Sequence, residues 1–252
     1  MGLISGVRNT LLPTKGTGTN QSLRVDDYGG LFSLQGLPAG LTAALEGSVF
    51  VARHAPAAGG TGVALGIVTS FVDTTPALVL TNAEATGGKT YLPLYIRARI
   101  TAAGSSSTSA EISAEVDNTN RYTSGGTALT STIAPTNAVS GPASNATLVV
   151  GAITAAAAGS RRRFVGAAVV KIAASPLWIV QDVVTITFGG VPQFAQTAAV
   201  VASDTAAPTV NSHVPLAACA VPPGGSFVLN WVNVANATTP PSVEFEMAWV
   251  ER

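Results

Sequence analysis

Short runs of β-branched and aromatic residues, each ended by Gly or Pro, follow one another along most of this chain. No apolar repeat of 3.6 residues persists for three turns, so the pattern does not favour long helices. Runs of this length and composition are typical of β-strands. Roughly ten to thirteen short strands with turns between them predict an all-β fold, an antiparallel β-sandwich or jelly roll.

We expect strands where these runs are clearest, and one short helix at residues 38–46. The expected strands span residues 48–53, 63–72, 77–81, 90–101, 110–116, 145–153, 164–173, 177–188, 226–234 and 242–250. Three strands have a predicted face, because alternate side chains of a strand point the same way. In residues 90–101 one face holds Leu92, Leu94, Ile96, Ala98 and Ile100, and the opposite face holds Tyr91, Tyr95, Arg97 and Arg99. In residues 177–188 one face holds Trp178, Val180, Val184, Ile186 and Phe188. In residues 242–250 one face holds Val243, Phe245, Met247 and Trp249, and the opposite face holds Glu244 and Glu246.

Residues 1–45 differ from residues 46–252, which we interpret as the β-sandwich domain. Gly and Pro punctuate the first segment so closely that little room is left for regular elements. It also holds more apolar residues than a solvated linker needs, and we therefore interpret it as an irregular arm that docks on a neighbouring subunit; disorder is the alternative. The candidate contact residues in this arm are Leu23, Leu31, Phe32 and Leu34.

Charge is scarce: 13 basic and 13 acidic residues give a net charge of zero, and charged residues make up 10% of the chain. An ordinary globular chain is about a quarter charged. Since charge keeps a free monomer soluble, this composition favours a chain that buries much of its surface against copies of itself or a larger assembly. Zero net charge also argues against direct nucleic-acid binding.

The motifs that carry chemistry are weak or incomplete. Gly87-Gly88-Lys89-Thr90 resembles the end of a phosphate-binding loop, but Ala83 stands where the first glycine is required, so we interpret the Gly pair as a hairpin turn. His54 and His213 have no metal-ligand spacing around them, and Cys219 is the only cysteine. We expect no cofactor, no metal and no membrane passage, since the most apolar stretch, residues 165–180, is too short and too interrupted.

Arg161, Arg162 and Arg163 form the one dense cluster of charge in the sequence. Such a cluster is often merely solvated. In a chain so poor in charge, it is also a candidate subunit contact, and its expected partner is a carboxylate on another subunit.

Three stretches together resemble virion structural proteins of tailed bacteriophages. They are the arm segment 22–30 (SLRVDDYGG), the segments 47–53 (GSVFVAR) and 61–65 (TGVAL), and the carboxyl-terminal segments 221–231 (VPPGGSFVLNW) and 245–251 (FEMAWVE). The resemblance implies a head-decoration, cement or tail-associated protein that binds the major capsid or tail protein. It further implies many copies, commonly as a homotrimer, in a virion assembled in the host cytoplasm, and it carries over no catalytic residues.

Three alternatives stay open. A receptor- or glycan-binding module would use exposed aromatic residues, for which Trp231 and Tyr122 are the candidates, whereas the strand phase of Trp178 and Trp249 predicts burial. A hydrolase on a β-sandwich would place one of the two histidines beside a carboxylate in a cleft. A jelly-roll capsid protein that itself forms the shell is the third alternative.

Overall fold

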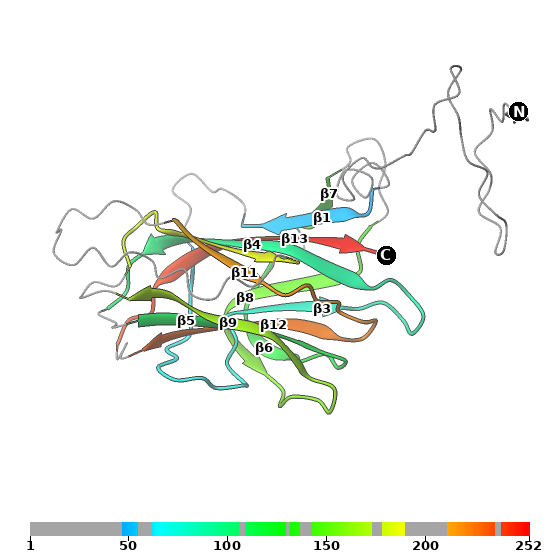
Figure 1. Ribbon diagram of the computed structural model, residues 1–252, viewed down its shortest axis with the longest axis horizontal. Helices are drawn as coiled ribbons and strands as arrows, with labels where there is room; N and C mark the ends of the chain where they lie inside the picture. The colour runs from blue at the N-terminus through cyan, green and yellow to red at the C-terminus, as the bar shows by residue number, and fades with distance from the viewer. Residues whose placement is uncertain are drawn as a thin grey trace, which may run out of the picture. The chain divides into compact units, whose positions relative to one another are not determined.

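Two β-sheets pack face to face, one formed by seven strands and the other by six (Figure 1). The computed structural model describes residues 47–54, 62–105, 109–129, 132–136, 143–172, 178–189, 211–234 and 238–252. The prediction of an all-β, mostly antiparallel sandwich is confirmed. The predicted arm and the predicted helix at 38–46 lie outside the described residues, and so do Leu23, Leu31, Phe32 and Leu34.

The seven-stranded sheet has the strand order β11-β10-β4-β13-β1-β7, with β2 paired to β13. Its strands are β1 (Val49–Arg53), β2 (Val63–Ala64), β4 (Tyr91–Ala102), β7 (Ala134–Pro135), β10 (Val183–Phe188), β11 (Asn211–Leu216) and β13 (Ser242–Glu251). Neighbouring strands run antiparallel, except for β10 and β11, which are parallel.

The six-stranded sheet has the strand order β6-β8-β3-β12-β5-β9, and all of its pairs are antiparallel. Its strands are β3 (Leu78–Asn82), β5 (Ser109–Asp117), β6 (Tyr122–Ala128), β8 (Ala146–Ala155), β9 (Arg163–Ile172) and β12 (Ser226–Val234). Residues 65–77 connect β2 to β3: the backbone N–H of Asn233 in β12 donates to the carbonyl oxygen of Val68, and the Asp73 carboxylate lies beside Arg121.

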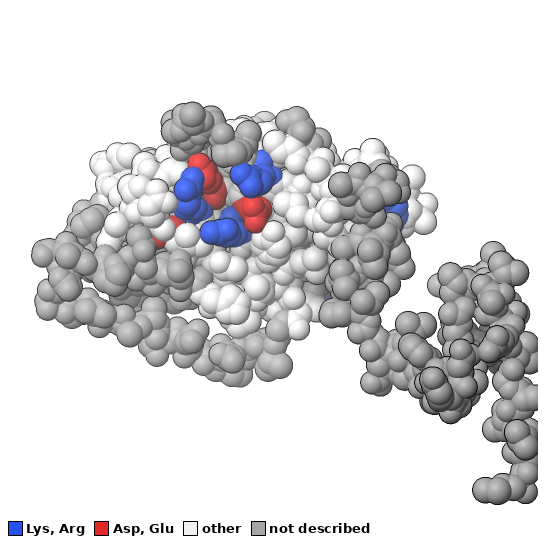
Figure 2. Space-filling view, turned by 90° about the horizontal axis from the view of Figure 1, so that it is seen from above, with Lys and Arg blue, Asp and Glu red and all other residues white. Residues whose placement is uncertain are grey.

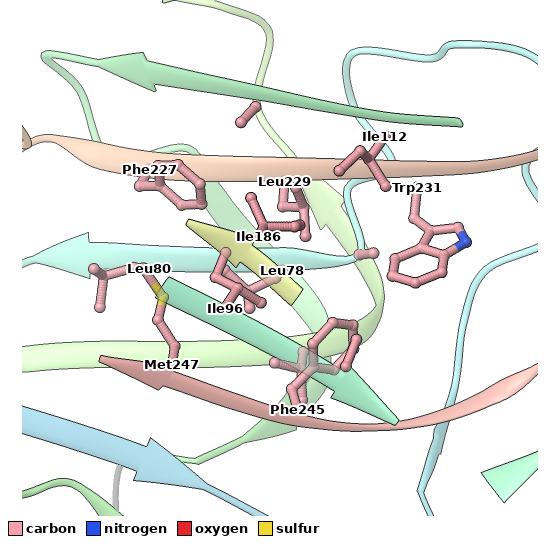
Figure 3. Close-up of a cluster of buried hydrophobic side chains, with 14 of the residues drawn as sticks. Leu78, Leu80, Ile96, Ile112, Ile186, Phe227, Leu229, Trp231, Phe245 and Met247 are labelled. Carbon is pink, nitrogen blue, oxygen red and sulfur yellow. The ribbon is translucent and has the colours of Figure 1, made fainter. Parts of the chain in front are cut away.

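The core lies between the sheets and is built by alternation along the strands. Figure 3 shows Phe227, Leu229 and Trp231 of β12 facing Phe245 and Met247 of β13. The predicted inward face of residues 242–250 is confirmed, as is the burial of Trp178 and Trp249. The predicted exposure of Trp231 is wrong: its exposed fraction is 1%, because it shares the inner face of β12 with Phe227 and Leu229.

The predicted face of residues 90–101 is wrong at its beginning, because β4 contains a bulge. Tyr95 lies opposite Ala248 and Pro93 lies opposite Trp249, so Leu94 is the extra residue. An extra residue inverts the alternation on one side of it. Leu92 and Leu94 therefore point outward, where they pack on Val49 and Val250.

The predicted strand at 177–188 begins later, at Val183, because a tight turn precedes it. Gln181 adopts a positive φ of 82°, and the carboxylate of Asp182 accepts the backbone N–H of Ile179 at 2.9 Å. Val180 is consequently exposed and does not share the buried face of Trp178. The predicted strand at 63–72 is likewise reduced to Val63–Ala64.

The turn at Gly87 and Gly88 joins β3 to β4, which belong to different sheets. The interpretation of this pair as a hairpin connection is therefore wrong. β6, β7 and β11 were not predicted from the sequence, since none of them carries a clear apolar alternation.

Candidate functional site

Five charged side chains gather on the outer face of the seven-stranded sheet: Arg53, Arg97, Arg99, Glu244 and Glu246 (Figure 2). They come from β1, β4 and β13, three adjacent strands. Each alternates along its strand with a residue of the core, so the same period that fills the sandwich points these groups outward.

The strand register sets charges of opposite sign side by side. Glu246 lies opposite Arg53 on one side and opposite Arg97 on the other, while Glu244 lies opposite Arg99. Directly opposite side chains on neighbouring strands are close enough to interact. These five side chains thus form a patch in which positive and negative charges alternate.

Hydrogen bonds hold two of these side chains in place, those of Arg99 and Glu246. Arg99 donates from Nε to Glu244 Oε2 at 3.0 Å, and its Nη1 donates to Gln181 Oε1 at 3.3 Å. Tyr95 donates its hydroxyl hydrogen to Glu246 Oε1 at 2.9 Å. Burial, together with the hydrogen bond to Glu246, raises the pKa of Tyr95 to about 12, so this hydroxyl remains a donor at neutral pH.

His54 follows β1 and pairs with β13 through both its backbone and its ring. Its N–H donates to the carbonyl oxygen of Phe245 at 3.1 Å, and the N–H of Phe245 donates to His54 Nδ1 at 3.0 Å. Burial lowers the pKa of His54, and the negative charge of Glu244 offsets this only in part. Because Nδ1 accepts a hydrogen bond, the proton of the neutral ring lies on Nε2.

These groups line an open pocket of about 300 Å³. Its walls are formed by Arg53, His54, Arg97, Arg99, Glu244, Phe245 and Glu246. Among the residues that the structure describes, two buried polar atoms of the lining have no hydrogen-bond partner, His54 Nε2 and Glu244 Oε1. An unpaired buried polar atom is costly, and neither of these two atoms has accessible surface through which the pocket could supply a partner.

The pocket brings together residues that sequence reasoning had kept apart. The sequence pattern placed Glu244 and Glu246 on the outward face of one strand and linked neither of them to His54, but all three residues line one pocket. A histidine beside a carboxylate in a cleft is the arrangement that the hydrolase alternative requires. His213 lies elsewhere on the sheet, with its Nε2 3.0 Å from Thr187 Oγ1.

A second charged group lies buried at the outer side of the six-stranded sheet, under residues 65–77. Its centre is Arg121, whose side chain is fully buried. Nη2 of Arg121 lies 3.0 Å from Asp73 Oδ1, and Nη1 lies 3.5 Å from Glu115 Oε1 and 3.7 Å from Asp117 Oδ2. A buried guanidinium with several carboxylates around it is a structural anchor, and no sequence motif predicts it.

Arg162 also belongs to this buried cluster. Its Nη1 lies 2.9 Å from Asp73 Oδ1, its Nε lies 3.6 Å from Glu115 Oε2, and its guanidinium lies 4.7 Å from the ring centre of Phe164. The carboxylates that Arg162 meets are those of its own chain. Arg161 and Arg163 are exposed, so the predicted subunit contact of the arginine cluster now depends on these two.

Neighbouring groups shift the pKa values within the buried cluster in opposite directions. Burial raises the pKa of Glu115, and the negative charge of Asp73 adds to this, although both arginines oppose it. Burial would also raise the pKa of Asp73, but the hydrogen bond and charge of Arg121, with help from Arg162, lower it overall. Asp73 is therefore the ionised partner of Arg121, while Glu115 is the carboxyl that favours its proton.

Within the described residues, no group of three or more His, Cys, Asp or Glu side chains is placed to hold a metal ion. In the same residues, no helix has the length and apolar character needed to cross a membrane. Cys219 is half-buried, and burial raises the pKa of its thiol to about 12.

Comparison with protein-family models found no match to this chain. Searches of curated proteins and of solved structures also found none.

Proposed function

We propose that this protein is a structural component of a virus particle. In this role it binds neighbouring copies of itself and the capsid shell, as a decoration or cement protein does, and catalyses nothing. The observation that carries the proposal is an apolar outer side on the six-stranded sheet, opposite the charged pocket.

Two large apolar side chains, Phe164 and Val169, are exposed on that outer side. Phe164 and Val169 of β9 lie opposite Glu115 and Glu111 of β5, on the same face. Three more exposed apolar side chains lie in residues 65–77, whose Asp73 contacts Arg121 on this side of the sheet. The exposed fractions are 54% for Ile67, 46% for Phe71, 42% for Val72, 62% for Phe164 and 51% for Val169. Apolar side chains gathered in this way mark a surface that binds another protein.

The chain also uses its few charges inside itself. The guanidinium groups of Arg99, Arg121 and Arg162 are engaged by carboxylates of the same chain, and Lys89 Nζ lies 3.2 Å from Glu251 Oε2. Little charge is left on the remaining described surface to keep it hydrated. This distribution supports a protein whose surface is covered in an assembly.

The strand order supports the particle reading further. When β2, β6, β7, β8 and β11 are set aside, β10, β4, β13 and β1 are consecutive in one sheet, and β3, β12, β5 and β9 are consecutive in the other. If these eight strands are renumbered 1 to 8 along the chain, their orders in the two sheets are 6-3-8-1 and 2-7-4-5. This is the order expected of a jelly roll. Viral capsid and lectin domains use this architecture.

The same strand order favours a second candidate, a jelly-roll protein that itself forms the shell. The two candidates differ in what the purified chain does alone. A shell-forming protein closes into particles visible by electron microscopy, whereas a decoration protein stops at a small oligomer, commonly a trimer, and binds to preformed shells.

The test is the mass of the purified full chain by light scattering, beside the double variant F164D/V169D and a chain lacking residues 1–45. We expect a trimer or larger species, which the double variant converts to monomer. A matched control, Thr185→Asp on the outer face of the other sheet, should leave the assembly intact. A monomeric full chain at high concentration would overturn the proposal, and loss of assembly without residues 1–45 would assign the arm its docking role.

A further inference from the structure

Strand β9 presents two chemically different ends on the outer face of the six-stranded sheet. Phe164, near its beginning, has an exposed fraction of 62%, and Val169, nearer its end, has an exposed fraction of 51%. Both lie on the outer face, because they are opposite Glu115 and Glu111, which alternate with the core residues of β5. At the usual rise of a strand, roughly 15 Å separates the two exposed side chains.

The first end, which we call the aromatic end, consists of Arg162 and Phe164 and is positively charged. The guanidinium of Arg162 is 29% exposed and lies 4.7 Å from the centre of the Phe164 ring. Four arginines gather here, namely Arg121, Arg161, Arg162 and Arg163. Three carboxyl groups accompany them, those of Asp73, Glu115 and Asp117. This end therefore keeps a positive charge even when all three carboxyl groups are ionised.

The second end, which we call the aliphatic end, consists of Val169 and Glu111 and is negatively charged. Glu111 is exposed, and no hydrogen bond or ion pair engages its carboxylate in the part of the chain that the structure describes. Lys171, the lysine of β9, lies opposite the core residue Ala110 and not opposite Glu111. The negative charge of Glu111 is thus available to a neighbouring molecule.

The two ends complement each other, whereas like ends repel. Contact between two aromatic ends would bring guanidinium groups together, and contact between two aliphatic ends would bring carboxylates together. Contact between unlike ends packs Phe164 on Val169 and sets Glu111 beside the arginines. An aromatic side chain with an arginine next to it is the kind of pair that carries much of the binding energy at protein interfaces.

The shape of β9 favours one of the two ways in which unlike ends can meet. A two-fold overlay of the whole strand would use both ends of both copies at once, and it suits a straight strand. β9 instead contains an extra residue, Val165, between its two ends. Such a bulge bends a strand and increases its twist, so the two ends face different directions. Each end is therefore placed to meet a different neighbour.

We propose that a second copy of the chain occupies this surface head to tail, with the aromatic end of one copy bound to the aliphatic end of the next. Glu111 of one copy is then the carboxylate that faces the arginine cluster of its neighbour. A head-to-tail contact closes into a ring when the rotation between copies permits it. This inference rests on the proposed function, to which it adds the residues and the direction of the contact between copies.

The experiment mixes two single variants of the full chain, Phe164→Asp and Val169→Asp, and measures mass by light scattering. Each variant lacks one end on every copy, so each alone should be a monomer, while the wild type forms a species of three or more copies. The mixture restores one intact contact, between the aromatic end of V169D and the aliphatic end of F164D. It should therefore give a dimer that grows no further. Circular dichroism checks that both variants are folded.

The outcomes separate this inference from the proposed function. A mixture that stays monomeric, or single variants that still assemble, would overturn the head-to-tail contact while an assembling wild type leaves the proposed function standing. A wild type that stops at two copies would overturn it in favour of the two-fold overlay. A monomeric wild type would overturn both proposals.

Glu111→Lys tests the charge of the contact separately. It sets a cation against the arginines of the neighbouring copy, so the concentration needed for half-assembly should rise at least about tenfold. The matched control Thr185→Lys, on the outer face of the other sheet, should leave that concentration unchanged. Equal assembly of folded E111K and wild type contradicts the pairing of Glu111 with the arginine cluster.

Discussion

Arg121 holds Asp73 at two points: its Nη2 lies 2.7 Å from the carbonyl oxygen of Asp73 and 3.0 Å from the carboxylate Oδ1. Its Nε donates to the carbonyl oxygen of Ala156 at 2.7 Å. One buried side chain therefore fastens two separate loops, residues 65–77 and 156–162, to the outer side of the six-stranded sheet. The exposed apolar residues of the first loop depend on this fastening for their position.

Arg121→Met should destabilise the protein by about 3–5 kcal/mol, because it removes the cation beside the buried Asp117 and leaves Asp73 with Arg162 alone. Urea unfolding followed by tryptophan fluorescence measures this loss. Arg161→Ala removes an exposed arginine and should change the free energy of unfolding by no more than about 0.5 kcal/mol. Equal effects of the two substitutions would show that Arg121 is no anchor.

Glu115→Gln should be well tolerated at neutral pH, because the pKa of Glu115 is raised by burial and by Asp73. The folded state holds this proton above the ordinary value of 4.5, so the wild type loses stability as pH rises from 4.5 through the folded pKa. The glutamine variant does not titrate there. The stability of the wild type minus that of Glu115→Gln should therefore decrease with rising pH, and a constant difference contradicts the assignment.

His54→Asn tests the neutral imidazole of the pocket. Burial lowers the pKa of His54 below 6.5, so its contribution to stability is complete above pH 6.5 and declines as pH falls toward the folded value. Asparagine does not titrate, and its carbonyl can accept the N–H of Phe245 as Nδ1 does. The stability difference between wild type and variant should shrink on acidification below pH 6.5. A difference that grows instead would mean that the ring is charged in the folded protein.

Asn233→Ala should cost about 2–3 kcal/mol, because Asn233 Oδ1 is the shared acceptor of two buried indoles. Trp178 Nε1 lies 2.9 Å from it and Trp231 Nε1 lies 3.3 Å from it, with the ring centres 5.5 Å apart. Near-ultraviolet circular dichroism should report the changed packing of the two rings. The matched substitution Asn145→Ala, at an exposed amide that bonds Glu84, should change stability by less than about 0.5 kcal/mol.

The fold class was predictable because the longest strands can be recognised from the sequence alone. β12 and β13 were expected at 226–234 and 242–250, and they lie at Ser226–Val234 and Ser242–Glu251. The bulge at Leu94 was not predictable, because it arises from pairing with β13, which is distant in sequence, and a period-2 pattern has no mark for an extra residue. β6 was not predicted, because its two consecutive glycines interrupt the alternation of apolar and polar side chains that identifies a strand.

The pocket was only half visible in the sequence. The outward phase of Arg97, Arg99, Glu244 and Glu246 was predicted, and the structure agrees. What joined them was the register between strands roughly 150 residues apart, for example Arg97 opposite Glu246, and register depends on the whole sheet. The same reason explains why Arg162 was assigned to a neighbour: its carboxylates, Asp73 and Glu115, lie far away along the chain.

β12 is the strand between β3 and β5, and β13 is the strand between β4 and β1. The centres of both sheets are thus supplied by residues 226–251, after every other strand has been synthesised. A nascent chain that lacks these residues has no central strand in either sheet, so the strands on the two sides of each sheet cannot be joined. Contacts between ends so distant in sequence make folding slow. Neither sheet can therefore complete its strand pairing before β12 and β13 are available.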